Sequence, residues 1–142
     1  MSYAAAITQL ETDALQILTK ADGGESLASE NIGKENEQLT IQGSALHAKI
    51  LFNETGSRQL DLGNVQSRRE KGFMQIRLFM ERYSGKGNIY TKADAITKYF
   101  RGKIGMNYTY RIRPQPYILN VPPDKGSFIK DVMVPFEVES FS

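Results

Sequence analysis

The sequence contains no cysteine and no tryptophan, and His47 is its only histidine. Without cysteine the chain has neither a disulfide framework nor thiol chemistry. One histidine leaves little material for a serine triad or a histidine-based metal site built from a single chain. No apolar run approaches the roughly 20 residues that a membrane helix needs, and the first residues lack the basic region of a signal peptide. We therefore expect no membrane contact, no metal, no cofactor and no catalytic residue.

Neither sign of charge dominates, because 18 Lys and Arg residues against 16 Asp and Glu give a formal net charge of only +2 over 142 residues. This value is too small by itself to indicate nucleic-acid binding. The distribution is uneven, however: residues 1–37 hold seven acidic and two basic residues, and residues 101–123 hold four basic residues and no acidic one. A chain with one acidic and one basic end can stack head to tail on copies of itself, although a chance imbalance of solvated faces gives the same pattern.

The stretch from Gly72 to Gly102 organises the chain. Met74, Ile76, Leu78 and Met80 alternate with Gln75, Arg77, Phe79 and Glu81. This period of two is typical of a strand with one buried face. After glycines 85 and 87 the apolar period changes to that of a helix, which we expect to end before Gly102. The order strand, glycine-rich turn, helix indicates a helix laid back on a sheet.

The rest of the chain adds further elements. An apolar stripe at helical spacing predicts a helix over residues 3–20. Alternation predicts strands over residues 46–52, 108–113 and 132–138, with shorter extended pieces at 39–41 and 117–121. Two irregular stretches, 22–37 and 53–71, are predicted to be mobile loops, and the second carries both basic and apolar side chains that suit an arm ordering on assembly.

These elements predict one domain over residues 1–142, an α+β two-layer sandwich. We expect a mixed, mostly antiparallel sheet of four to five strands with two helices packed on one face. The other face of the sheet keeps charged side chains together with Leu51 and Phe79. A partly apolar open face of this kind is typical of a subunit interface before assembly.

Two other functions fit parts of the sequence. Six tyrosines between residues 83 and 117 are interleaved with basic residues, so a small nucleic-acid-binding module with a Tyr/Arg sheet face is the alternative hypothesis; core and interface tyrosines explain the same pattern. The run from Gly85 to Gly87 contains Lys86 and resembles part of a phosphate loop, but it lacks the full motif spacing. A small hydrolase using Lys86 or His47 is the remaining hypothesis.

The segment from Ala45 to Lys103 resembles the phage tail terminator proteins, also called tail completion or minor tail proteins, of long-tailed phages. The resemblance starts with a strand ending near Phe52 and a polar loop with Ser57-Arg58-Gln59 and Leu62-Gly63. It continues with bases at Arg68-Arg69 and Lys71, Gly72, the alternating strand Phe73 to Met80, the Gly85-x-Gly87 turn and the helix Ala93 to Gly102. The closing strand Val132 to Phe136 also fits. The helix at residues 3–20 matches in kind only, and the acidic loop at 22–37 has no place in the family pattern.

The resemblance implies a structural virion protein rather than an enzyme. Proteins of this family form a hexameric ring on the finished tail tube, stop its polymerisation and provide the joint to the head-completion, or neck, proteins. DNA passes through the ring without sequence-specific binding. The expected partners are therefore copies of the chain, the major tail tube protein and a neck protein, and the expected location is the head-proximal end of the tail, after assembly in the host cytoplasm. The expected contact residues are Arg58, Arg68, Arg69, Lys71, Phe79 and Lys86.

Overall fold

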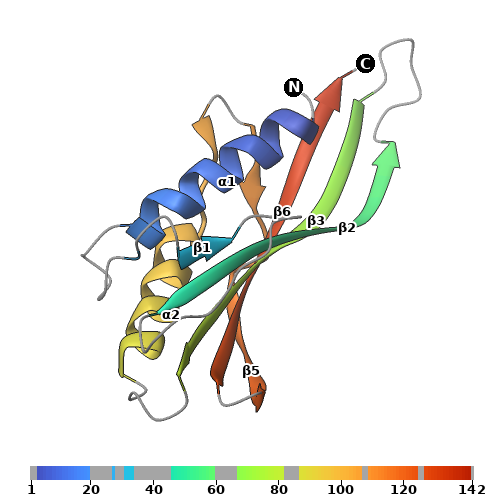
Figure 1. Ribbon diagram of the computed structural model, residues 1–142. Coiled ribbons are helices and arrows are strands. Elements are labelled where there is room, and N and C mark those ends of the chain that lie inside the picture. Colours follow the sequence, from blue (N-terminus) through green and yellow to red (C-terminus); the bar gives the residue numbers. More distant parts are fainter. Residues whose placement is uncertain are drawn as a thin grey trace.

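One mixed sheet with both helices on the same face forms the molecule (Figure 1). The computed structural model describes residues 3–19, 27, 31–33, 46–59, 67–81, 87–106, 109–124 and 127–141. The elements are α1 (Tyr3–Thr19), β1 (Ile32–Gly33), β2 (His47–Gln59), β3 (Ser67–Glu81), α2 (Gly87–Phe100), β4 (Arg111–Ile112), β5 (Tyr117–Asp124) and β6 (Ser127–Phe141). The predicted α+β two-layer sandwich is confirmed, with six strands in the described sheet rather than four to five.

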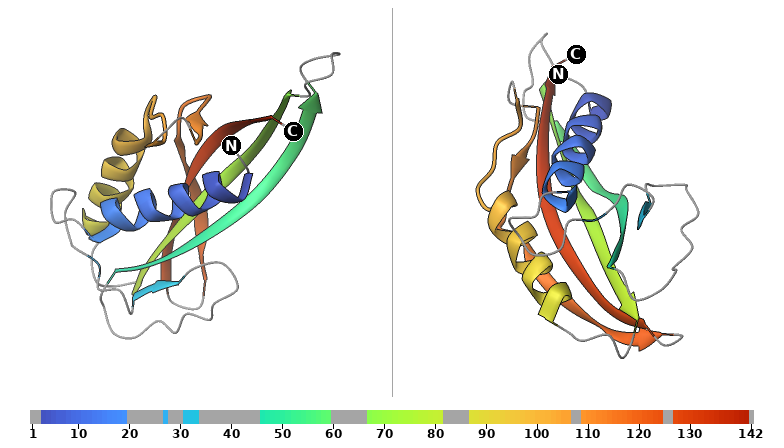
Figure 2. Two further views of the ribbon diagram at one scale, coloured as in Figure 1. Left: turned by 90° about the horizontal axis from the view of Figure 1, so that it is seen from above. Right: turned by 60° about the vertical axis from the view of Figure 1, so that its left-hand side comes forward.

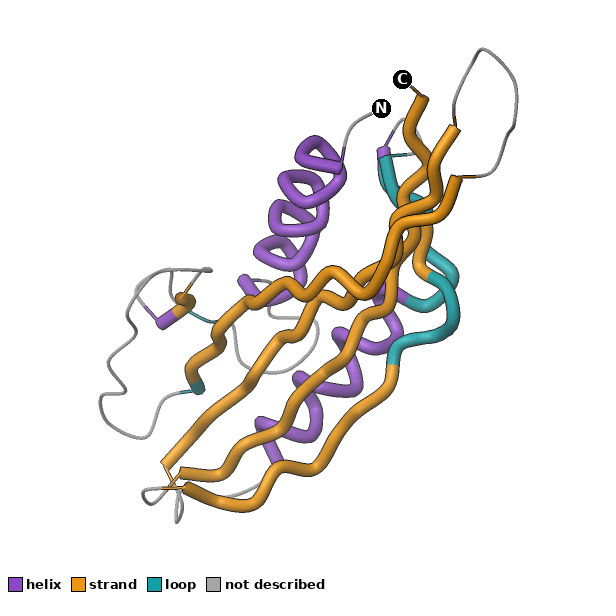
Figure 3. The backbone as a smooth tube through the Cα atoms, turned by 90° about the vertical axis from the view of Figure 1, so that its right-hand side faces the viewer, coloured by secondary structure: helices purple, strands orange, loops and turns teal. Residues whose placement is uncertain are grey.

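The strand order is β1-β2-β3-β6-β4, and β5 pairs with β6 along the same edge as β4. Only β1 is parallel to its neighbour; every other described pairing is antiparallel. The longest ladder joins β3 to β6 over their full 15 residues, from Ser67 opposite Phe141 to Glu81 opposite Ser127. Figure 3 shows β2 and β5 at opposite edges of the sheet, with both helices behind it.

The core lies between the helices and one face of the sheet. Alternate residues of β3 point into it, which confirms the period-two prediction for this strand. The same alternation places Ala48 and Ile50 of β2 in the core, together with every second residue of β6 from Val132 to Val138. The fully buried contributions of the three strands are Ala48, Ile50, Met74, Ile76, Leu78, Val132, Val134 and Val138.

Both predicted helices are present. Leu10 and Leu18 of α1 and Ile96 and Phe100 of α2 are completely buried against the sheet, as their helical spacing predicts. Gly102 has φ of +65°, a left-handed conformation that follows α2 and that glycine adopts without a Cβ penalty. The predicted helix end is therefore confirmed.

The prediction of a mobile loop over residues 53–71 was wrong at both ends. β2 continues to Gln59, β3 begins at Ser67, and the ladder between them includes Gly56 opposite Lys71 and Gln59 opposite Arg68. A register shift between Glu54 and Gly56 interrupts this ladder once. Figure 2 shows these strand ends extending past the start of α1, so no helix covers them. Strands held by backbone pairing alone need no apolar alternation, which is why the sequence pattern failed there.

Two other loop predictions need correction. Within the expected mobile loop 22–37, Leu27 is buried and its amide donates a hydrogen bond to the carbonyl of Leu18. Ile32 and Gly33 pair with β2 at Ala48 and Lys49. Anchor residues spaced among polar ones give no periodic signal, so the sequence did not reveal them. The expected strand 108–113 is reduced to β4, and the expected piece at 39–41 lies outside the described residues.

Candidate functional site

The face of the sheet opposite the helices is the candidate site, and we call it the open face. Its side chains come from the strand positions that alternate with the core positions. They lie in cross-strand rows fixed by the register, with Lys49 opposite Arg77, Arg77 opposite Asp131 and Asp131 opposite Leu119 in one row. The residues of the open face include Lys49, Leu51, Phe73, Gln75, Arg77, Phe79, Tyr117, Leu119, Asp131 and Met133.

A charged network occupies the middle of the open face. Arg77 Nε donates to Asp131 Oδ1 at 2.8 Å, and Arg77 Nη2 donates to Asp131 Oδ2 at 2.9 Å. Gln75 Nε2 donates to the same Oδ2 at 2.8 Å. The Asp131 side chain is only 4% exposed, whereas that of Arg77 is 35% exposed. The carboxylate is thus fixed in place, and part of the guanidinium stays accessible from outside.

The electrostatics keep this pair charged. Hydrogen bonding to Asp131 raises the pKa of Arg77 above its ordinary value, and it outweighs the lowering caused by partial burial of the guanidinium. Two parallel N–H···O bonds also fix the plane of the guanidinium. The centre of the open face therefore presents one oriented cation with a satisfied counter-ion.

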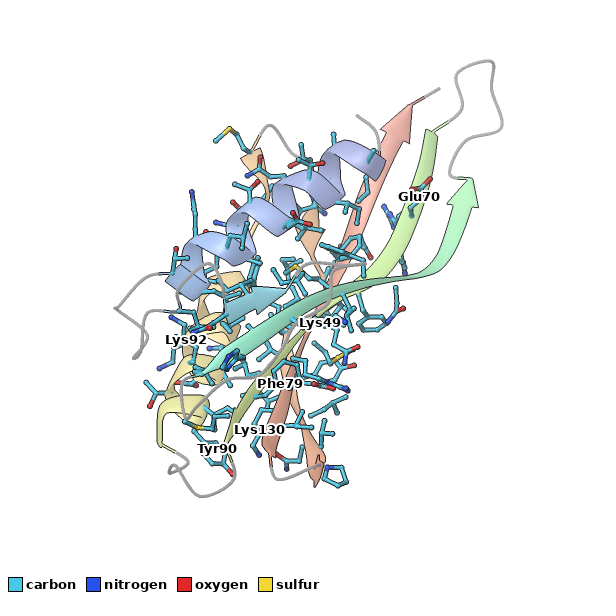
Figure 4. All side chains as sticks on the ribbon, in the orientation of Figure 1. Lys49, Glu70, Phe79, Tyr90, Lys92 and Lys130 are labelled. Carbon is cyan, nitrogen blue, oxygen red and sulfur yellow. The ribbon has the colours of Figure 1, made fainter. Side chains whose placement is uncertain are left out.

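Apolar side chains surround this network. Leu51, Phe73, Phe79 and Met133 are half-buried although no helix lies over them, and Tyr117 and Leu119 are exposed at the β5 edge. Lys49 and Phe79 lie on the neighbouring strands β2 and β3 (Figure 4). Aromatic residues, methionine and arginine are enriched at protein–protein interfaces, and the open face carries all three.

A second charged group lies at the end of the same face, next to β4. Arg69 Nη2 is 3.0 Å from Glu139 Oε1, and Lys71 Nζ is 3.7 Å from Glu137 Oε1. Arg69 Nε is buried without a hydrogen bond and lies 3.9 Å from Glu137 Oε2. A small cavity of about 190 Å³ adjoins this group. Its lining residues are Ile104, Tyr110, Arg111, Glu137 and Glu139.

The predicted contact residues fall into three groups. Phe79 lies on the open face, and Arg69 and Lys71 lie at its charged end, already bound to carboxylates of the same chain. Arg58 and Arg68 belong to the β2–β3 ladder, opposite Arg69 and Gln59 respectively. Lys86 lies outside the described residues. The structure therefore brings Phe79, Arg69 and Lys71 onto one surface.

The tyrosines do not gather on that surface. Tyr90 and Tyr99 belong to α2, where Lys130 and Lys103 each lie 4.4 Å from the respective ring centre; Figure 4 shows Tyr90 beside Lys130. Tyr110 is buried and donates a short hydrogen bond to Asp13 of α1. Of the tyrosines in the described part of the chain, only Tyr117 lies on the open face. This scatter disfavours a stacking platform for nucleic-acid bases.

The remaining chemical candidates gain little. His47 is fully buried in β2. Across the residues that the structure describes, no three His, Cys, Asp or Glu side chains cluster as metal ligands would. Neither described helix is long and apolar enough to cross a bilayer.

Sequence reasoning missed the Arg77–Asp131 pair. Residue 131 precedes the apolar alternation of β6, so the predicted last strand began one residue too late to include it. The sequence did offer one sign, an aspartate directly before the alternating residues 132–138. Aspartate is depleted in strands, so its presence beside a strand was unusual. Only the register between β3 and β6 shows that Arg77 lies opposite it.

Comparison with known proteins adds information about the fold. No protein-family model matches the chain, and no curated protein matches it. Solved structures do match: one, whose name gives no function, superposes with a TM-score of 0.68 at 15% sequence identity. The match covers 97% of this chain and 96% of the other. At this identity the likeness concerns the fold alone, and it extends over essentially the whole sequence.

Proposed function

We propose that the chain is a structural protein that works by docking, and that it forms a ring at the end of a phage tail tube. In this role it stops tube polymerisation and provides the joint to the neck proteins, as the resemblance to tail terminators implies. The observation that carries the proposal is the open face. A broad, partly apolar sheet surface, with Arg77 and Asp131 already paired at its centre, lies opposite both helices.

The composition of the open face supports docking. Half-buried Phe73, Phe79 and Met133 give apolar area, and burial of such area is the main driving force for association. The Arg77–Asp131 pair is satisfied within one copy, so covering it does not leave an unpaired charge. The ion pairs of Arg69 and Lys71 at the end of the face are accessible enough to exchange partners on docking.

The test is a tube-assembly experiment with the major tail tube protein that the proposal implies as a partner. Purified chain is added to polymerising tube protein, and tube lengths and ends are measured by electron microscopy. We expect capped ends, shorter tubes and no further growth after fresh tube protein is added. Tubes that keep growing at unchanged rate would contradict the proposal.

A matched pair of variants separates docking from folding. Phe79→Asp places a charge on the open face, whereas Thr12→Asp places the same charge on an exposed position of α1. We expect Phe79→Asp to lose capping at least tenfold and Thr12→Asp to retain it, with both proteins folded by circular dichroism. Equal loss in the two variants would mean that the open face has no special role.

A further inference from the structure

Strand β5 is a bare sheet edge. Three consecutive large apolar residues of β5 are exposed: Tyr117 to 41%, Ile118 to 38% and Leu119 to 45%. Successive strand residues point to opposite faces, so β5 is open on both faces. Within the described residues, β5 pairs only with β6 and has no strand on its outer side. Figure 3 shows it as the outermost strand of the sheet.

The first five residues of β5 carry nothing that protects this edge. The protective features of the strand lie at its far end, where the register with β6 shifts after Val121 and Pro122, Pro123 and Asp124 follow. Natural edge strands usually carry a charge, a bulge or a proline that blocks pairing with another chain. Residues 117–121 contain none of these, although Pro116 and Pro122 stand on either side. Because proline cannot donate a backbone hydrogen bond, these two residues limit pairing to about the five residues between them. The strand is thus suited to accept one short, extended segment.

The opposite edge of the same sheet is also open. β1 pairs with β2 only at Ala48 and Lys49, and no described strand pairs with the outer side of β2 from Ile50 onward. This edge also carries apolar residues on both faces, with Ile50 and Phe52 toward the helices and Leu51 toward the open face. The two free edges therefore both carry apolar residues on each face of the sheet, and those of β5 are the more exposed.

The strand directions match as well. Three successive antiparallel steps lead from β2 through β3 and β6 to β5, so β2 and β5 run in opposite directions. Two copies placed side by side in the same orientation bring β5 of one against β2 of the other in an antiparallel arrangement. Antiparallel pairing needs no reorientation of either copy, and it keeps all helices on one side.

We propose that β5 of one copy pairs with the outer edge of β2 in the next copy, continuing the sheet from subunit to subunit. The contact joins two different surfaces, so it generates a closed ring or an open filament rather than a twofold dimer. This pairing is the contact between copies in the proposed ring, so the inference rests on the proposed function. A five-residue ladder buries far less than the roughly 1,600 Å² of a standard stable interface. Isolated copies therefore associate weakly, and ring closure or a tube end stabilises the assembly.

The absence of cysteine provides a direct test, because a disulfide forms only where two introduced cysteines come within about 7 Å between Cα atoms. Leu51→Cys, Asn53→Cys and Leu119→Cys are made as separate proteins, because both β2 positions lie on the open face within reach of Leu119 in an antiparallel pairing. Each β2 variant is mixed with Leu119→Cys under mild oxidation, both at high concentration and with tube protein. We expect a covalent dimer of twice 16.0 kDa in at least one mixture and little in any of the proteins alone. Thr12→Cys mixed with Leu119→Cys is the control and should stay monomeric.

Each other outcome has a definite meaning. Efficient cross-linking of Leu119→Cys with itself would indicate a twofold β5–β5 contact and overturn the proposal. Rings or capped tubes in which Leu119→Cys cross-links with neither Leu51→Cys nor Asn53→Cys would overturn the edge pairing while leaving the proposed function intact. A cross-linked mixture that does not cap tubes would support the edge pairing and count against the proposed function. Leu119→Lys, at an exposed position, should abolish the assembly with an unchanged melting temperature; assembly that survives it would also overturn the proposal.

Discussion

Asp131 of β6 holds the guanidinium of Arg77 on β3 through two hydrogen bonds, of 2.8 and 2.9 Å, and the pair lies among apolar side chains on the open face. The aspartate is almost completely buried, and the arginine is about one-third exposed. Their Cα atoms are direct partners in the longest ladder of the sheet. The pair therefore forms only in this register of β3 and β6, the two strands from which most of the open face is built.

Removing the carboxylate of Asp131 alone should lower the free energy of unfolding more than replacing both partners of the pair. Asp131→Asn removes the negative charge and leaves one acceptor oxygen for the three hydrogen bonds that Arg77 and Gln75 donate. We expect a loss of about 1–3 kcal/mol in the free energy of unfolding. Replacing both partners, with Arg77→Met and Asp131→Leu, should recover part of that loss because no unpaired charge remains. Urea unfolding of the three proteins measures this. A double variant less stable than Asp131→Asn would contradict the interpretation.

Gly72 should not tolerate a side chain. A Cβ at this position would lie 2.7 Å from the carbonyl oxygen of Asn53 and 2.9 Å from Cζ of the Phe136 ring. Gly72→Ala therefore has to shift the β2 backbone or the buried Phe136, and we expect a loss of about 1–3 kcal/mol in chemical denaturation. Gly102→Ala is the informative comparison, since no atom lies within 4 Å of its Cβ but its φ is +65°. Gly102→Ala should lower the free energy of unfolding by about 1 kcal/mol through backbone strain alone.

The hydrogen bond between Tyr110 and Asp13 should make the protein sensitive to alkali. Burial, followed by the hydrogen bond to Asp13, raises the pKa of Tyr110 well above its ordinary value of 10.0. The folded state therefore keeps a proton that the unfolded state loses, so this stabilisation is complete below pH 10 and declines as the pH rises further. Thermal unfolding between pH 8 and 11 should show a steeper decline for the natural protein than for Tyr110→Phe. Parallel curves would assign no role to this tyrosine.

The sequence predicted the elements that touch the core. Burial imposes a period, which identified the helix ending at Phe100 by its apolar stripe and the strand over residues 73–80 by its apolar residue at every second position. The extension of β2 to Gln59 was missed because backbone pairing beyond the helices imposes none. Phe79 and Leu51 were expected on an exposed sheet face, and the register places them there.

The centre of the candidate site could not be read from the sequence. Arg77 and Asp131 are 54 residues apart, and their contact depends on the register between two strands separated by a helix and two further strands. The exposure of β5 on both faces is likewise a property of the strand order. A run such as that from Tyr117 to Val121 has the same composition in a central strand as at an edge.

Two surface ion pairs, one at the end of the open face and one on α2, separate effects on stability from effects on tube capping. Arg69 pairs with Glu139 at 3.0 Å, and Lys98 on α2 pairs with Asp94 at 3.1 Å, both at the protein surface. Ion pairs of this kind contribute at most about 1 kcal/mol, so Arg69→Ala and Lys98→Ala should both unfold within about 1 kcal/mol of the natural protein. If Arg69 contacts a partner, Arg69→Ala should weaken tube capping severalfold while Lys98→Ala leaves it unchanged. Urea titration and the tube-length assay check the two quantities separately, and equal capping by both variants would remove Arg69 from the set of contact residues.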